Sequence, residues 1–269
     1  MHYAAVKHGN LSGSNSSVTC ICFDNIDGDL IAGGSSDSAL RVWSTSSLRI
    51  QHTFTGHNSK ISCATFLPSA EQILISGSND RTIRYWDLAS RQCCHTICVG
   101  SSLLHVAANS SGLLASSHWD KTVRLWDRRQ SSPIISTTMP ARISTILWTG
   151  DDQYFCTCRD HSIYLYSRYS SNKPMVVFSD ENLKIPSDNS LSCLSPDHRF
   201  IAVGSDKINI PLVVWNIEDY STEQKPYIFE CDSEKTKGLS NNPIICAAWN
   251  PHGRGILALS KQKYITYWR

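Results

Sequence analysis

The chain has 269 residues, with 25 Lys and Arg against 23 Asp and Glu, so its formal net charge at pH 7 is +2. Hydrophobic residues make up 41% and charged residues 18% of the sequence, which excludes a wholly disordered chain and gives no electrostatic case for nucleic-acid binding. No stretch approaches the roughly 18 apolar residues of a membrane span. The first ten residues lack the apolar centre of a signal peptide, and we read the 11 cysteines as free thiols, so we expect a cytoplasmic location.

Aromatic residues recur near the ends of similar segments along the chain. They are Trp43, Trp86, Trp126, Tyr166, Trp215 and Trp268, at spacings of 43, 40, 40, 49 and 53 residues. Six positions before each of the first four stands an aspartate: Asp37, Asp80, Asp120 and Asp160. We expect each aspartate to sit in a tight turn and each aromatic side chain to lie on the strand that follows.

Each period contains four short strand-like stretches. In the first period they are 18–23, 30–34, the stretch from Asp37 to Trp43, and 50–54. Polar turns rich in Gly, Ser, Asp and Asn separate them, and no segment keeps a helical period beyond one or two turns. A repeat of about 40 to 45 residues with four strands is typical of a β-propeller blade.

The pairs Gly56-His57 and Trp86-Asp87, with a second pair Trp126-Asp127, resemble WD repeats. The resemblance implies an all-β WD-repeat β-propeller, a single domain over residues 1–269. We expect six blades at about 17–56, 57–100, 101–140, 141–187, 188–242 and 243–269.

The last of these segments ends before a fourth strand of its own. We expect residues 3–11 to supply that outer strand, because closing the ring removes open sheet edges. The alternative is a fragment that lacks a blade before residue 3, and so an incomplete ring of seven.

A narrower resemblance is carried by several short runs. They are Leu11-Ser12-Gly13-Ser14-Asn15, Thr53 to His57, Ser76 to Thr82, Gly100-Ser101-Ser102, Ser117 to Lys121 and Cys158-Arg159-Asp160. These runs are similar to the C-terminal propeller of the autophagy-related protein 16 family. Members of that family resemble a coiled-coil scaffold that ends in a seven-bladed propeller, whereas this sequence has no heptad region and about one blade fewer.

The resemblance implies a non-catalytic scaffold that recruits partners for autophagy and for conjugation of ubiquitin-like autophagy proteins at membranes. Candidate partners are vacuolar proton ATPase subunits and autophagy factors, with membrane association only through them. An aromatic and a basic residue form a functional patch in that family, and the matched positions here are Trp119 and Arg142. An exposed Trp beside an Arg is typical of an interface hot spot, although the Trp can instead pack flat on a neighbouring blade.

The candidate patch gathers residues from two kinds of turn that share one face of a propeller. Besides Trp119 and Arg142 it includes His118, Lys60 and Arg159. In segment 221–242 the apolar run Tyr227-Ile228-Phe229 is predicted to be a fourth strand, and the polar remainder a long solvated turn, with a recognition loop as the alternative. Segment 178–190 is predicted to be a second loop of the same kind.

His57, Ser76, Asp80 and Trp86 are spaced so that they meet within one blade. A Ser, a His and an Asp resemble a hydrolase triad, but we favour a buried hydrogen-bond network that supports the blade. The position of Ser76 is occupied by Gly33 in the first blade and by Cys156 in the fourth. The third blade lacks the turn His.

No catalytic residue, metal site or cofactor is implied by the sequence. The cysteines of the run Cys93-Cys94-His95 and Cys98 alternate along one strand, so they do not converge on a metal ion. Two other functions are kept as alternatives. One is a different WD-repeat adaptor, such as a ubiquitin-ligase substrate receptor, and the other is a propeller hydrolase, which the apolar inner strands argue against.

Overall fold

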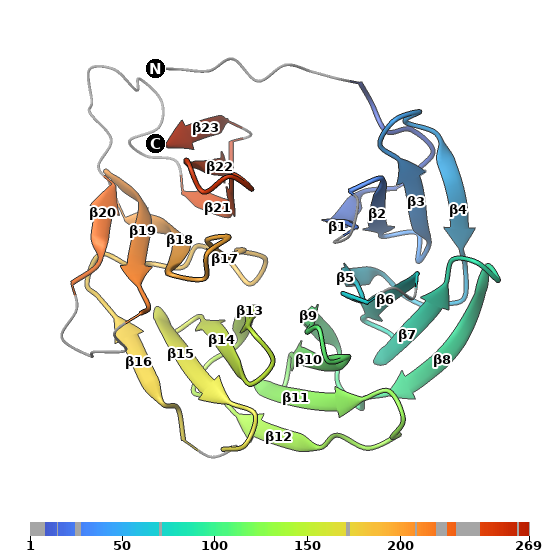
Figure 1. Cartoon of the computed structure of the whole chain (residues 1–269), viewed down its shortest axis with the longest axis horizontal. Coiled ribbons are helices and arrows are strands. Elements are labelled where there is room, and N and C mark those ends of the chain that lie inside the picture. The colour runs from blue at the N-terminus through green and yellow to red at the C-terminus, as the bar shows by residue number, and fades with distance from the viewer. Residues whose placement is uncertain are drawn as a thin grey trace. The chain divides into compact units, whose positions relative to one another are not determined.

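The computed structural model describes residues 9–14, 16–24, 28–69, 72–170, 173–207, 209–218, 225–229, 243–262 and 264–268. The described residues form 23 strands and no helix (Figure 1). None of them belongs to a helix that is long and apolar enough to cross a membrane.

The chain divides into two compact units, Lys7–Met139 and Pro140–Arg269, which we call the N-terminal and C-terminal units. Each unit contains three antiparallel sheets, which we call blades and number 1 to 6 along the chain. Within each unit, consecutive blades are neighbours, because β5 contacts both β1 and β9, and β17 contacts both β13 and β21.

The N-terminal unit holds three blades of four strands each. Blade 1 consists of β1 (Val18–Phe23), β2 (Leu30–Ser35), β3 (Leu40–Ser44) and β4 (Ile50–Phe54). Blade 2 consists of β5 (Ile61–Phe66), β6 (Ile73–Ser78), β7 (Thr82–Asp87) and β8 (Gln92–Cys98). Blade 3 consists of β9 (Leu103–Ala108), β10 (Leu113–His118), β11 (Thr122–Asp127) and β12 (Ile135–Thr138).

The C-terminal unit holds two blades of four strands and one of three. Blade 4 consists of β13 (Ile143–Thr149), β14 (Gln153–Cys158), β15 (Ser162–Ser167) and β16 (Val176–Ser179). Blade 5 consists of β17 (Cys193–Leu194), β18 (Phe200–Lys207), β19 (Ile210–Asn216) and β20 (Tyr227–Phe229). Blade 6 consists of β21 (Ile244–Trp249), β22 (Ile256–Ser260) and β23 (Ile265–Trp268).

The all-β prediction with a repeating blade is confirmed, and each set of strands lies within its expected residue range. The expected outer strand from residues 3–11 falls mostly outside the described residues, and residues 9–11 form no strand. The fourth strand predicted at Tyr227-Ile228-Phe229 is confirmed as β20, and most of the remainder of 221–242 lies outside the described residues.

A β-bulge recurs in the first strand of five blades. The register shifts between Val18 and Cys20 in blade 1, and at the matching places of blades 2, 3, 4 and 6. In three of these bulges the extra residue carries a hydroxyl that donates to a carbonyl of the second strand: Thr19 to Gly34, Ser62 to Gly77 and Ser144 to Thr157. The hydroxyl replaces a ladder hydrogen bond that the bulge removes.

The core lies between the blades of each unit. In the N-terminal unit Phe66 of blade 2 packs in one cluster with Ala32, Leu40 and Val42 of blade 1. A blade between two others, such as blade 2, is therefore apolar on both faces and is covered by its neighbours, as expected for sheets stacked face to face.

The prediction that segment 178–190 is a solvated loop is wrong for its apolar residues. Leu183 and Ile185 are almost fully buried and pack in the core of blades 4 and 5 with Ile163 and Val203. These two apolar side chains help to anchor the segment, because burial of each is worth roughly 1.5 to 3 kcal/mol.

Replacing Ile83 tests how much a blade depends on its neighbour. The side chain of Ile83 is fully buried between blades 2 and 3, so we expect Ile83→Ala to lower the free energy of unfolding by about 2 to 5 kcal/mol. Ile134 of the same unit is 48% exposed, and Ile134→Ala should change it by less than about 0.5 kcal/mol. Urea unfolding followed by fluorescence measures both, and equal losses would contradict the described packing.

Candidate interaction surface

The four turn aspartates share one local geometry. The carboxylates of Asp37, Asp80, Asp120 and Asp160 each accept a hydrogen bond from the backbone N–H two residues later. The residue after each aspartate has a positive φ of 64 to 67°. A carboxylate that bonds its own backbone holds such a tight turn closed, which accounts for the recurrence of Asp at this position.

In three blades the turn aspartate also pairs with the side chain four residues later. Arg41 lies 2.7 Å from Asp37, Arg124 lies 2.6 Å from Asp120, and the Tyr164 hydroxyl donates to Asp160 at 2.6 Å. In blade 2, Asp80 instead pairs with the turn histidine, His57. The aspartate therefore ties the turn to the third strand or to the segment before the blade.

The four side chains expected to meet in blade 2 are hydrogen-bonded in series. His57 Nδ1 lies 2.8 Å from Asp80 Oδ2, and His57 Nε2 lies 2.8 Å from Ser76 Oγ. The Trp86 indole N–H donates to Ser76 Oγ at 2.8 Å. Burial lowers the pKa of His57 against the opposing effect of Asp80, so the neutral ring donates from Nδ1 to the carboxylate and accepts at Nε2.

This order of Asp, His and Ser matches the hydrogen bonds of a hydrolase triad. A nucleophile must reach its substrate, yet Ser76 is fully buried and its oxygen accepts from Trp86. Burial raises the pKa of Asp80, but hydrogen bonds from Thr82, Asn58 and His57 bring it down to about 2. The geometry therefore suits a permanent structural network that satisfies each buried polar group.

Blade 3 builds the same network from a different residue. The Trp126 indole N–H donates to Ser116 Oγ at 2.7 Å, and Ser116 Oγ lies 2.8 Å from Nε2 of His118. Nδ1 of His118 lies 3.4 Å from the carbonyl oxygen of Ser101, the residue that stands where blade 2 has its turn histidine. A histidine from the end of β10 thus replaces the missing one.

His118 therefore does not belong to an exposed patch, contrary to the sequence expectation. Its side chain is fully buried, and burial together with the charge of Arg124 lowers its pKa to about 4. The residue before the turn aspartate points outward while the one before that points inward, because side chains alternate at a strand end.

Blades 1 and 4 satisfy their aromatic residues in other ways. In blade 1 the ring of Trp43 lies against Gly33, where a Cβ would come within 3.0 Å of it, and its N–H donates to the carbonyl of Ser12 at 2.9 Å. In blade 4 Tyr166 stacks on Tyr154 with ring centroids 5.8 Å apart, beside a buried Cys156.

Trp119 is the exposed member of the candidate patch in the N-terminal unit. Its side chain is 48% exposed, although it follows the fully buried His118. Its backbone N–H donates to the carbonyl of Ser102 at 3.0 Å, which fixes the turn. Lys60, predicted beside it, is half-buried at the start of β5, where its carbonyl accepts from Asn79 and Ser78.

The two patch residues in the C-terminal unit share one acidic partner. Arg142 lies 3.1 Å from Asp188, and Arg159 lies 3.5 Å from the other oxygen of the same carboxylate. Arg159 also donates to the carbonyl of Ile185. The sequence did not indicate that these arginines hold segment 178–190 to blade 4, since Asp188 lies about thirty residues beyond Arg159 in the chain.

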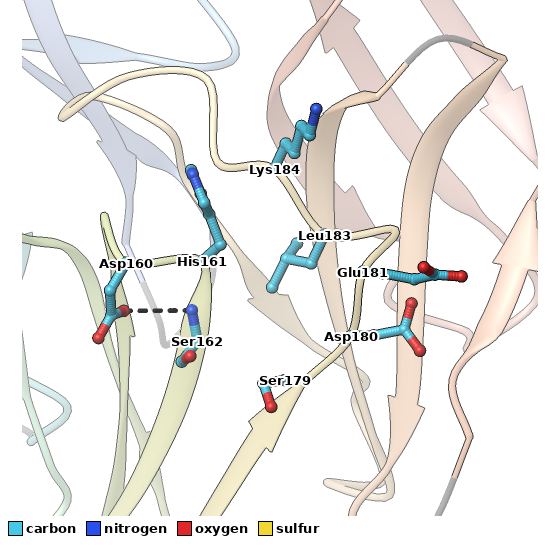
Figure 2. Close-up of a pocket in the computed structure, with 8 residues that line it drawn as sticks. All are labelled: Asp160, His161, Ser162, Ser179, Asp180, Glu181, Leu183 and Lys184. Carbon is cyan, nitrogen blue, oxygen red and sulfur yellow. Dashed lines mark hydrogen bonds between the residues drawn. The ribbon is translucent and has the colours of Figure 1, made fainter.

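A hollow of about 410 Å³ lies beside this segment (Figure 2). It is lined by Asp160, His161, Ser162, Ser179, Asp180, Glu181, Leu183 and Lys184. His161 Nδ1 accepts from the backbone N–H of Ile185 at 3.0 Å. The charged lining of the hollow consists of three carboxylates, those of Asp160, Asp180 and Glu181, and one lysine, Lys184.

Among the described residues no group of three His, Cys, Asp or Glu side chains is arranged to hold a metal ion. The cysteines of the structure are free. The partly buried Cys20 and the buried Cys63 lie on the first strands of blades 1 and 2, and desolvation raises the pKa of Cys20 to about 11. They act there as small apolar side chains.

Three segments of the chain match the family model "WD domain, G-beta repeat": residues 6–44, 48–87 and 91–127. All three correspond to blades 1 to 3, which keep the Trp and the turn aspartate. Blades 1 to 3 are therefore WD repeats, the repeating unit of a β-propeller.

Relatives with autophagy names align with most of the chain. It is 32% identical to the "Autophagic-related protein 16.2" of Caenorhabditis elegans over 64% of this chain and 31% of the relative. It is 27% identical to "Autophagy-related protein 16" of Arabidopsis thaliana over 96% of this chain and 48% of the relative. The "DDB1- and CUL4-associated factor 13" of Danio rerio is 26% identical over 58% of this chain and 32% of the relative. The chain thus spans less than half the length of these relatives.

Removal of the shared hydroxyl of blade 2 should be costly. Ser76→Ala would leave His57 Nε2 and the Trp86 N–H buried without their partner, and each such group costs roughly 1 to 3 kcal/mol. We expect a loss of about 2 to 4 kcal/mol in urea unfolding. Ser69 offers the control, because its buried hydroxyl has no hydrogen-bond partner, so Ser69→Ala removes an unsatisfied group and should not lower the stability. Equal effects would mean that the network contributes nothing.

The stability of the chain should fall in mild acid partly through His118. The unfolded chain binds this proton with a pKa near 6.5, whereas the folded chain binds it only near 4. The unfolded state therefore holds more protons between these values, and stability decreases as the pH drops through them. At pH 4.5 the loss through this one group is about 2 to 3 kcal/mol.

His118→Gln keeps a side chain that can bond to Ser116 but cannot titrate. In this variant the free energy of unfolding, measured in urea between pH 7.5 and 4.5, should depend less steeply on pH, by the equivalent of about one proton. His105, whose pKa burial lowers to about 4, and His57, whose pKa burial also lowers, still contribute to the remaining slope. An unchanged slope would contradict a neutral, buried His118.

Proposed function

We propose that the chain is a non-catalytic protein-interaction scaffold of the kind represented by autophagy-related protein 16. The alignment over 96% of the chain with the Arabidopsis thaliana protein of that name is the observation that carries the proposal. A WD-repeat fold supports a binding role, because its turns are held on a rigid framework of strands.

On this proposal the chain recruits partners for autophagy and for conjugation of ubiquitin-like proteins at membranes. It reaches autophagic or endolysosomal membranes from the cytoplasm through those partners. Autophagy factors and vacuolar proton ATPase subunits are the proposed partners, carried over from the family resemblance.

Trp119 is the proposed contact residue in the N-terminal unit. A half-exposed indole on a turn fixed by Asp120 and by the Ser102 carbonyl loses little entropy on binding. Trp is also the residue type most enriched among interface hot spots. His118 supports this turn from inside through Ser116.

Arg142 and Arg159 are proposed to contribute less than Trp119. Both already face Asp188, so an acidic group on a partner has to compete with that carboxylate. Because the side chains of Arg142 and Arg159 are 36% and 30% exposed, salt screens what they add.

A quantitative pull-down from cell lysate tests the proposal. We expect Trp119→Ala to lower capture of autophagy factors or proton ATPase subunits by at least tenfold, as truncation of a hot spot of about 2 kcal/mol does, and Arg142→Ala to lower it less. Tyr169→Ala is the control, because Tyr169 is 73% exposed but lies in the turn after β15, whereas the Asp160 turn precedes β15. Thermal melts check that each variant is folded, and equal capture by all variants would overturn the role of Trp119.

A ubiquitin-ligase substrate receptor is the second candidate. The similarity to the DDB1- and CUL4-associated factor 13 favours it. Capture of DDB1 without autophagy factors in the same pull-down would replace the first proposal by this one.

A further inference from the structure

The connection between the third and fourth strands of blade 3 is longer than its counterparts in the same unit. It comprises residues 128–134, between β11 and β12, whereas blade 1 uses 45–49 and blade 2 uses 88–91. Every residue of this longer loop is exposed. The loop begins with the run Arg128-Arg129-Gln130-Ser131-Ser132-Pro133. It therefore presents two arginines, two serines and a proline to solvent.

The serines of the two shorter connections are hydrogen-bonded within their turns. In blade 1 the hydroxyl of Ser46 lies 2.9 Å from that of Ser44. In blade 2 the backbone N–H of Ser90 donates to the carboxylate of Asp87 at 3.2 Å. A segment bonded in this way has to break its turn before it can extend into the groove of another protein.

The longer loop is anchored near its two ends. The backbone N–H groups of Gln130 and Ile134 donate to carbonyls of β11 at 2.9 and 2.8 Å. Between them, neither Ser131 nor Ser132 makes a hydrogen bond to any part of the chain that the structure describes. The serines can therefore enter an extended conformation without the loss of a strand hydrogen bond.

Both arginines of the loop lie at the surface. Arg129 forms an ion pair with Asp127, in which Nε lies 2.9 and 3.0 Å from the two carboxylate oxygens. The side chain of Arg129 is nonetheless 82% exposed, so solvent screens the pair and another anion can displace the carboxylate at little cost. Arg128 is exposed as well. Guanidinium groups bind carboxylates through two parallel hydrogen bonds, so the loop offers two such donors just before its serines.

We propose that Ser131 is a phosphorylation site, modified by a serine kinase whose substrate groove carries carboxylates for Arg128 and Arg129. Kinases select their substrates partly by the pattern of charge around the acceptor. The arginines stand three and two positions before Ser131. In an extended segment these positions lie roughly 10 and 7 Å from the acceptor residue, so one groove can bind all three side chains.

Ser132 is the poorer acceptor of the two serines. Pro133 follows it directly and has no backbone N–H with which a groove can hold the chain. Ser131 is followed by a residue that keeps its N–H. The charge pattern and the backbone therefore favour the same hydroxyl.

The transfer balances with ATP as the phosphoryl donor. The Ser131 hydroxyl oxygen forms a bond to the γ-phosphorus while the bond from that phosphorus to the β,γ-bridging oxygen breaks, and ADP leaves. The hydroxyl proton passes to the catalytic aspartate of the kinase. Residues 127–134 hold two arginines and one aspartate. A phosphate of about −1.5 to −2 therefore changes their net charge from +1 to roughly −0.5 to −1.

The phosphate also gives Arg129 a second anionic partner besides Asp127. Phosphoserine has three acceptor oxygens and forms charge-assisted hydrogen bonds with arginine. The modified loop follows β11, whereas Trp119 lies in the turn before that strand. The inference therefore does not depend on the proposed scaffold function.

Phosphorylation of the purified 269-residue chain tests the proposal. The probe is the catalytic subunit of cyclic-AMP-dependent protein kinase, an arginine-selecting serine kinase, with Mg²⁺ and ATP, and mass spectrometry locates the phosphate. We expect close to one phosphate per chain, on Ser131. Ser131→Ala should lower incorporation by roughly tenfold or more, and Arg128→Gln and Arg129→Gln should each lower the rate by about tenfold, because each removes a charge-assisted contact with the kinase.

Ser44 is the internal control for folding. It stands three residues after Arg41, the spacing that separates Ser131 from Arg128. Ser44 is only 6% exposed and lies in β3, so the folded chain should carry no phosphate there. Ser136→Ala is the control variant, because Ser136 is exposed on β12 without an arginine in the three positions before it, and it should leave incorporation unchanged.

Three outcomes would overturn the proposal. Incorporation no higher than that of the Ser131→Ala chain excludes Ser131 as the acceptor. Phosphate found mainly on Ser132 assigns the site to the neighbouring serine. Rates that are unchanged in Arg128→Gln and Arg129→Gln exclude recognition through the arginines. Thermal melts check that each variant is folded.

Discussion

The need to cover both faces of every blade governs this structure. A blade of three or four short strands is apolar on both sides, so it has no stable form on its own and must pack between neighbours. Phe66 illustrates the rule, because its ring belongs to blade 2 but is buried by Ala32, Leu40 and Val42 of blade 1.

Packing sheets so closely forces polar groups into the interior, and each blade has its own way of satisfying them. The Trp86 and Trp126 indoles donate to a serine on the second strand, whereas Trp43 donates to the carbonyl of Ser12. In blade 4 Tyr166 takes the place of the tryptophan and stacks on Tyr154, so there is no indole N–H to satisfy. The partners differ between blades because leaving a buried donor without a hydrogen bond costs more free energy than any one partner adds to stability.

The sequence allowed most of the fold to be predicted but less of the candidate surface. The period of the aromatic residues and the aspartates six positions earlier determined the blades, because both signals are local to one repeat. The role of His118 was missed, since its partners Ser101 and Ser116 meet it only after two strands pair. The link from Arg142 and Arg159 to Asp188 was missed for the same reason, as contacts across a long stretch of chain leave no periodic trace.

The structural network and the proposed binding residue are consequences of one turn. Asp120 closes the turn between β10 and β11, and the inward-facing His118 takes up the network that blade 2 assigns to His57. Alternation along the strand then directs the next side chain, Trp119, to the surface. A buried hydrogen-bond network and an exposed indole therefore arise from adjacent residues. A substitution of His118 should alter partner binding by changing the position of Trp119.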